Sequence, residues 1–81
     1  MSSDTLEFSK KARDLKMGKY RHFKGAEYEV LGIARHSETQ EELVVYKALY
    51  GDGNLWARPI DMFIERVEKE NYNGPRFKFI K

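Results

Sequence analysis

The chain has 81 residues, a net charge of +2 and no cysteine. A chain of this length forms one domain with a thin core, because it buries only about 60–65% of the surface that its unfolded form exposes. The absence of cysteine excludes disulfides, thiolate zinc sites and cysteine nucleophiles, and fits a reducing compartment. No apolar run reaches the roughly 18 residues of a membrane span, and the first residues lack the pattern of a secretion signal. We therefore expect a cytoplasmic protein without a membrane attachment.

The charges are unevenly distributed along the chain. Residues 1–24 hold seven Lys/Arg and three acidic residues, residues 25–54 hold two and six, and residues 55–81 hold six and four. Asp14 is the single acid among the basic side chains of residues 10–24. Such a stretch either faces solvent or contacts the phosphate groups of a ligand.

Residues 4–15 are predicted to form a helix. Asp4 can cap its N-terminus, and Glu7 stands in the capping-box position three residues later. Three apolar residues recur at helical spacing: Phe8, Ala12 and Leu15. An isolated helix of this length is marginal in water, so it either docks on the rest of the chain or frays.

Beyond Gly18 the pattern changes to that of short strands. We expect strands at residues 19–23, 27–35, 43–50 and 55–58. Gly32 lies where the apolar set of the second strand changes face, which indicates a bulge or bend. The Asp-Gly and Gly-Asn pairs within residues 51–54 predict a tight hairpin turn.

The pattern after Pro59 allows two interpretations. Residues 60–67 have the apolar spacing of a helix, whereas a helical turn at 59–63 followed by a strand at 64–69 fits equally. We favour the second, because residues 71–75 form a cluster of turn-forming residues and residues 77–80 alternate as a closing strand. The sequence therefore predicts a mostly β fold, a small antiparallel SH3-like barrel of five or six short strands with an N-terminal helix and one helical turn.

Several phrases of the sequence occur together in one known family. They are GKYRHFKG at 18–25, YEVLG at 28–32, ARHSET at 34–39, VYKALYG at 45–51, LWARP at 55–59 and MF at 62–63. This part of the chain resembles DUF1653, a small bacterial family of unknown function. The resemblance implies an SH3-type barrel over residues 18–81, with residues 1–17 as a helical extension. It implies no activity, cofactor or catalytic residue.

Aromatic residues fall in the expected strands or at their ends. They are Tyr20, Tyr28, Tyr46, Tyr50 and Trp56. Such rings either line a binding groove or fill the core of a small barrel. Strand alternation places Tyr46 and Tyr50 on one face, so we expect both in the core or both at the surface. His22, on the Tyr20 side of its strand, either contacts a phosphate or base, or is a partly buried barrel histidine.

Two arginines lie at strand ends. Arg35 precedes His36, and Arg58 follows Trp56 by two residues. Arginine binds carboxylates and phosphates in a bidentate manner, so both are candidate ligand-binding residues. Arg58, flanked by Trp56 and Pro59, either anchors a ligand or holds an internal carboxylate such as Glu38 or Asp61.

The leading hypothesis is a non-catalytic module that binds nucleic acid or a segment of another protein. Its expected ligand-binding residues are Tyr20, His22, Arg35, His36, Tyr46, Tyr50, Trp56 and Arg58. No catalytic residue, metal site or cofactor is predicted, because the polar loop at 36–39 offers no nucleophile with a separate base and orienting group. The alternatives are an accessory subunit that docks through its N-terminal helix, and an enzyme that uses His36, Glu38 and Arg58. The oligomeric state stays open.

Overall fold

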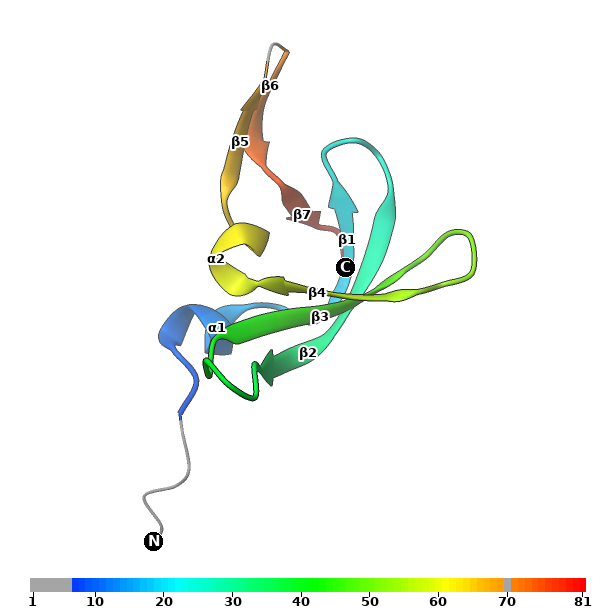
Figure 1. Ribbon diagram of the computed structural model, residues 1–81. Helices are drawn as coiled ribbons and strands as arrows, with labels where there is room; N and C mark the ends of the chain where they lie inside the picture. The colour runs from blue at the N-terminus through cyan, green and yellow to red at the C-terminus, as the bar shows by residue number, and fades with distance from the viewer. Residues whose placement is uncertain (1–6, 70) are drawn as a thin grey trace, which may run out of the picture.

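The protein is an antiparallel β structure with two short helices (Figure 1). The computed structural model describes residues 7–69 and 71–81. Five strands form one sheet in the order β4-β3-β2-β1-β7, and two form a separate hairpin, β5-β6. The elements are α1 (Lys10–Asp14), β1 (Gly18–His22), β2 (Glu27–Arg35), β3 (Glu42–Ala48), β4 (Leu55–Pro59), α2 (Ile60–Phe63), β5 (Arg66–Lys69), β6 (Tyr72–Pro75) and β7 (Phe77–Phe79).

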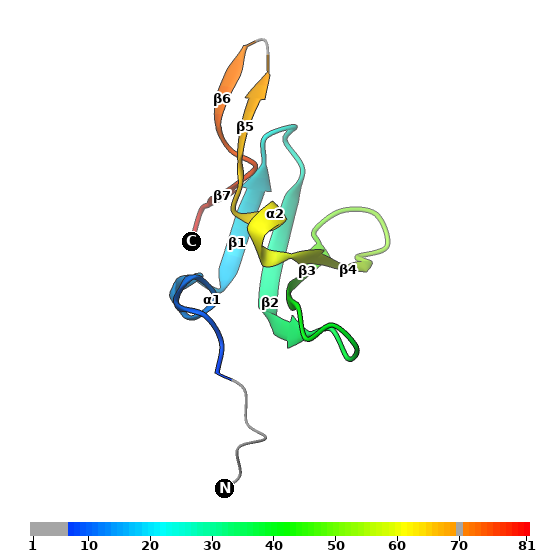
Figure 2. The ribbon, with the colours of Figure 1, turned by 60° about the vertical axis from the view of Figure 1, so that its left-hand side comes forward.

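The five-stranded sheet is bent at β2. The pairing of β2 with β3 shifts register between Val30 and Gly32, so that Leu31 is an extra residue in the ladder. This bulge confirms the irregularity predicted at Gly32, and β3 and β4 run across the direction of β1 (Figures 1 and 2). In the part of the chain that the structure describes, no pairing joins β4 to β7. The sheet is therefore not closed, and the expected SH3-like barrel is not confirmed.

Strand β4 is a free edge of this sheet. The N–H of Ala48 donates to the carbonyl of Asn54 at 2.9 Å. Because bonding alternates along an antiparallel pair, Leu55, Ala57 and Pro59 direct their backbone groups away from β3. Pro59 has no N–H to donate, so at this position it removes no bond from the sheet.

The core lies on the concave face of the bent sheet, where α2 covers it. Phe63 of α2 is 1% exposed and its ring stacks on Phe77 of β7, with 4.2 Å between ring centroids. The buried cluster contains Ala12, Tyr20, Val30, Val44, Tyr46, Ile60, Phe63 and Phe77. Burial of a side chain as large as Phe63 contributes about 1.5–3 kcal/mol, so a few such residues stabilise this small fold.

The N-terminal helix is shorter than predicted. It begins at Lys10, and Ser9 is its N-cap, accepting a hydrogen bond from the N–H of Ala12 at 3.3 Å. Glu7 therefore lies outside the helix, while residues 4–6 of the predicted helix, including Asp4, fall outside the described residues. Glu42 of β3 accepts hydrogen bonds from the N–H and hydroxyl of Ser9, at 2.6 and 2.7 Å. The capping carboxylate thus comes from a distant strand, which local spacing cannot reveal.

This N-terminal segment packs on the sheet. Ala12 is 4% exposed and belongs to the core, and Phe8 and Leu15 pack against it. Of the two alternatives for the segment, docking and fraying, its described residues dock.

The second half of the chain differs from the prediction at β5 and β6. The helical turn after Pro59 is confirmed, although β5 begins at Arg66 and not at residue 64. Residues 71–75, predicted as a turn, contain strand β6. Residues 72–75 pair with β5 in antiparallel register, with Arg66 opposite Pro75. Turn-forming residues are tolerated there because this hairpin has only two strands and both are edges.

Candidate binding surface

The concave face carries rings that pack around Phe77. Four rings have centroids within 6 Å of the Phe77 centroid, at 4.2 Å for Phe63, 4.9 Å for His22, 5.4 Å for Tyr46 and 5.6 Å for Tyr28. We call these five residues the Phe77 cluster. All but the stacked Phe63 meet Phe77 edge to face, an arrangement that adds about 0.5–1.5 kcal/mol per pair to the burial of the rings.

Arg58 is directed at this cluster. Its Cζ lies 5.7 Å from the Phe77 centroid, and its Nε donates to the Tyr46 hydroxyl at 3.2 Å. The arginine thus binds a phenol of its own chain, and neither Glu38 nor Asp61 is its partner here.

The surroundings of His22 in the same cluster favour its neutral ring. Burial lowers its pKa, and the charges of Arg76, Arg58 and Lys24 lower it further. Its Nδ1 accepts the N–H of Lys24 at 3.1 Å, so the proton of the neutral ring resides on Nε2.

The exposed rim of the Phe77 cluster contains Tyr50 and Trp56. Each is about half exposed, at 50% and 51%, whereas Tyr46 is 4% exposed. The prediction that Tyr46 and Tyr50 share one environment is therefore wrong, because β3 ends at Ala48 and alternation ends with it. The hydroxyl oxygens of Tyr28 and Tyr50 lie 2.9 Å apart. Burial, assisted by Tyr50, raises the pKa of Tyr28 to about 12.

Tyr20 and Arg35 have internal partners. The Tyr20 hydroxyl donates to the carbonyl of Lys16 at 2.6 Å, and burial raises the pKa of this phenol. Arg35 donates to the carbonyls of Gln40 and Glu7, both at 2.7 Å, and its guanidinium lies 5.0 Å from the Phe8 ring centroid. Arg35 thus ties the N-terminal segment to the sheet.

His36 organises its own loop. Its Nδ1 accepts the N–H groups of Glu38 and Thr39 at 3.1 and 3.3 Å. Of the eight expected ligand-binding residues, the structure brings five together at the Phe77 cluster and its rim: His22, Tyr46, Tyr50, Trp56 and Arg58. Tyr20 lies deeper in the core, and Arg35 and His36 lie at the far end of β2.

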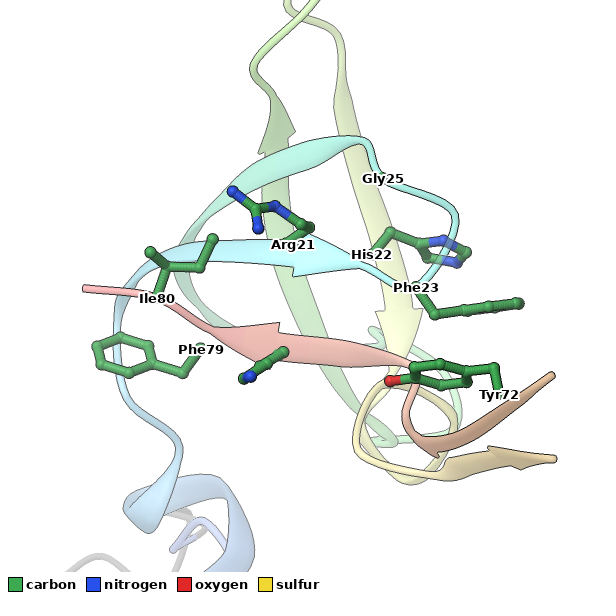
Figure 3. Close-up of a pocket in the computed structure, with 8 residues that line it drawn as sticks. Arg21, His22, Phe23, Gly25, Tyr72, Phe79 and Ile80 are labelled. Atoms are coloured by element: carbon green, nitrogen blue, oxygen red, sulfur yellow. The ribbon is translucent and has the colours of Figure 1, made fainter. Parts of the chain in front are cut away.

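A hollow of about 420 Å³ lies over β1, β7 and the start of β6 (Figure 3). We call it the β1–β7 hollow. Its lining residues are Arg21, His22, Phe23, Gly25, Tyr72, Lys78, Phe79 and Ile80. The rings of Phe23 and Tyr72 are stacked, with 5.4 Å between centroids and 23° between planes. The two rings come from the β1–β2 turn and from the hairpin, at distant places in the sequence.

Backbone pairing positions the polar side chains of the hollow. Arg21 of β1 lies opposite Lys78 of β7. Directly opposite residues share a face, and alternation turns this face away from the core that Tyr20 and Phe77 enter. Both cationic side chains are exposed.

The stacked rings are fixed by contacts on each side. The N–H of Phe23 donates to the carbonyl of Arg76 at 2.9 Å, and the Tyr72 hydroxyl donates to the carbonyl of Pro75 at 2.6 Å. At Gly74 a Cβ atom would lie 2.8 Å from the Tyr72 hydroxyl oxygen, so this glycine makes room for the ring.

The lining of the hollow is basic and apolar. Arg21 binds Glu27 through Nη2 at 2.6 Å and Nε at 3.1 Å, and Lys19 lies 3.3 Å from the same carboxylate. These contacts lower the pKa of Glu27. Lys24 adds a further positive charge, with its Nζ 5.9 Å from the Phe23 ring centroid.

Sequence reasoning identified one lining residue of this hollow, His22. Arg21 and Lys24 belong to the basic stretch at 10–24, which was the available signal for this surface. No sequence pattern predicted that Phe23 and Tyr72 form part of a site, because Tyr72 falls in the segment predicted as a turn.

The described residues, 7–69 and 71–81, also bear on metal binding and on membrane crossing. Within these ranges no group of three His, Asp or Glu side chains could hold a metal ion. No helix of the described chain has the length and apolar character needed to cross a membrane.

Comparison with known proteins gives a family and a similar structure. The family model described as a protein of unknown function, DUF1653, matches residues 18–79. A crystal structure of a DUF1653 protein from Bordetella bronchiseptica is 37% identical, with a TM-score of 0.79, and the match covers 85% of this chain and 91% of that one. No curated protein matches the sequence.

Proposed function

This chain belongs to the DUF1653 family, whose function is unknown, and we propose that it is a non-catalytic module that binds single-stranded nucleic acid in the β1–β7 hollow. The observation that carries the proposal is the stacked Phe23–Tyr72 pair beside Arg21 and Lys78. Aromatic rings accept any base by stacking, with about 1–3 kcal/mol per base. Adjacent lysine and arginine side chains bind the phosphates between the bases.

Positive charge extends to both sides of the hollow. Lys24 lies over Phe23 at one end, and Lys16 lies 5.0 Å from the Phe79 ring centroid. A strand of nucleic acid that crosses β1 and β7 would therefore meet cations along its path. Glu27 partly neutralises Arg21, so Lys78 supplies much of the free charge at the centre.

A protein segment is the second candidate ligand, and one observation favours it. Tyr50 and Trp56 are half exposed at the rim of the Phe77 cluster, where rings of this kind accept apolar or proline-rich peptide segments. Binding there would depend weakly on salt, whereas binding of nucleic acid falls steeply with salt.

We also infer that the bent sheet is an open version of the expected SH3-like barrel. Two features support this inference. The strands that come first and last along the chain, β1 and β7, are neighbours in the sheet. The helical turn α2 separates β4 from the strands that follow it in the chain. An experimental structure in which the sheet curves as in such a barrel while β4 and β7 stay unpaired would support the inference. The expected cytoplasmic location stays a prediction, to be checked by cell fractionation.

The test of the nucleic-acid proposal is fluorescence anisotropy with labelled single-stranded DNA and RNA of mixed sequence. Affinity is measured at low and at physiological salt. We expect Lys78→Glu to weaken binding about tenfold or more, because it replaces an attraction to phosphate by a repulsion. Lys47→Glu is the matched control, since Lys47 is also an exposed strand lysine but lies on β3.

A second variant tests the stacking. Phe23→Leu keeps an apolar side chain and removes the ring, so we expect weaker binding at both salt concentrations. Absence of binding to either nucleic acid, or equal loss in the Lys78→Glu and Lys47→Glu variants, would refute the proposal and direct the search to peptide ligands.

A further inference from the structure

The β4 edge exposes large apolar side chains. Leu55 is 62% exposed and Trp56 is 51% exposed. Other large apolar side chains at least 40% exposed lie on the neighbouring turn and on α2: Leu49, Tyr50 and Met62. Large apolar side chains exposed along an unpaired edge are typical of interaction sites.

Residues 55–57 of this edge lack the devices that keep edge strands apart, whereas Arg58 and Pro59 stand at its C-terminal end. Natural edges are blunted by shortness, charge, proline or bulges. The opposite edge of the sheet, β7, has three residues with Lys78 at its centre. Strand β4 has five residues, and residues 55–57 carry no charge. The backbone groups of Leu55 and Ala57 point away from β3, where a further strand can form hydrogen bonds with them.

We propose that two copies of this chain associate by antiparallel pairing of their β4 strands about a two-fold axis at Ala57. In this register Ala57 faces Ala57 of the second copy, and their N–H and C=O groups bond reciprocally. The N–H of Leu55 reaches the carbonyl of Pro59 in the second copy. The missing N–H of Pro59 falls at the end of the ladder.

The side chains of β4 are self-complementary in this register. Trp56 lies opposite Arg58 of the second copy on the same side of the sheet, so its indole ring can pack on the methylene groups of this arginine, whose guanidinium keeps its hydrogen bond to Tyr46 of its own chain. The only charge of the strand is thus already bound within its own chain, and the two Arg58 side chains are kept apart. The small Ala57 side chain at the axis permits close approach of the two backbones. These features favour a second copy over an unrelated strand.

The dimer leaves the β1–β7 hollow free. Strands β4 and β7 are the two ends of the sheet order, so pairing at one end does not cover the other. Association and nucleic-acid binding can therefore be tested separately, and failure of one does not decide the other.

The first test is crosslinking of single-cysteine variants, which the cysteine-free chain makes unambiguous. Paired residues at the axis have Cα atoms about 5.5 Å apart, within the span of a disulfide. We expect Ala57→Cys to form a disulfide dimer under mild oxidation much faster than Asp52→Cys, an exposed position in the neighbouring turn. Equal rates for the two variants would overturn the proposal.

The second test is sedimentation velocity over a concentration series. We expect the unmodified chain to dimerise, and Leu55→Lys to raise the dimer dissociation constant at least tenfold. Met17→Lys is the control, since Met17 is 47% exposed and lies outside β4. Circular dichroism checks that each variant is folded. A chain that stays monomeric at millimolar concentration, or a dimer that Leu55→Lys leaves unchanged, would contradict association through β4.

Discussion

The Phe77 cluster and the β1–β7 hollow contain the same kinds of side chain but differ in what these side chains contact. In the cluster, rings pack on rings and Arg58 is bound by Tyr46. In the hollow, the Phe23–Tyr72 pair lies at an open surface beside exposed cationic side chains. His22 belongs to both regions. The difference teaches that aromatic residues alone do not locate a site in a small domain. What matters is whether other side chains of the same chain already pack against the rings.

The largest expected effect is at the centre of the Phe77 cluster. Phe77→Ala should lower the free energy of unfolding by about 3–5 kcal/mol, because it removes a buried ring and leaves a cavity. Urea denaturation followed by circular dichroism measures the change. Ile80→Ala, on the partly exposed lining of the hollow, should cost less than about 1 kcal/mol. Equal costs would show that the cluster is not the centre of stability.

The next largest effect is expected at Gly74, in the hairpin that contributes Tyr72 to the hollow. Gly74→Ala would place a methyl group against the Tyr72 ring. We expect a loss of about 1–3 kcal/mol in stability and a weaker affinity for single-stranded nucleic acid, because the ring must shift. Gly32→Ala is the control, since a Cβ there meets no atom within 4 Å. Unchanged stability in Gly74→Ala would show that Tyr72 moves freely.

A smaller effect is expected at the hydroxyl that binds Arg58. Tyr46→Phe should lower stability by about 1 kcal/mol, because the partly buried guanidinium loses its hydrogen bond. Tyr50→Phe, at a half-exposed ring, should cost less than about 0.5 kcal/mol. Thermal and urea unfolding distinguish the two variants. A larger loss in Tyr50→Phe would place the important hydroxyl at the rim of the cluster.

The smallest effect is the titration of His22, the residue shared by both regions. We expect NMR to give a pKa below the ordinary value of about 6.5, because burial and nearby positive charges disfavour the imidazolium. The unfolded chain then binds a proton more readily than the folded one, so stability falls as the pH drops through about 6.5, and the loss levels off below the folded-state pKa.

Two variants check the cause of this titration. His22→Gln should abolish this part of the pH dependence. Arg58→Gln should raise the pKa of His22, since it removes one of the charges that lower it. A midpoint at or above 6.5 in the unmodified chain would contradict the assignment.

Local sequence patterns predicted the elements whose signals are local. The bulge at Gly32, the turn near residue 52 and the helical turn after Pro59 follow from glycine and proline chemistry at single positions. The helix start was wrong because its capping carboxylate, Glu42, belongs to another strand. The segment at 71–75 was wrong because its residues gain a strand partner in β5 that composition does not show.

The candidate site was predicted only in part for a similar reason. The grouping of Tyr46, Trp56 and Arg58 follows from strand pairing, which the sequence suggested. The stacking of Phe23 on Tyr72 depends on the pairing of β1 with β7, which joins the two ends of the domain. No periodicity in either segment points to the other.

The hollow forms only when β1 pairs with β7. Strands β1, β2 and β3 are neighbours in sequence and in space, so their pairing closes only short loops. The hollow needs Tyr72 and Lys78 near the C-terminal end. A truncated chain that ends before β7 therefore has no place to hold a ligand there.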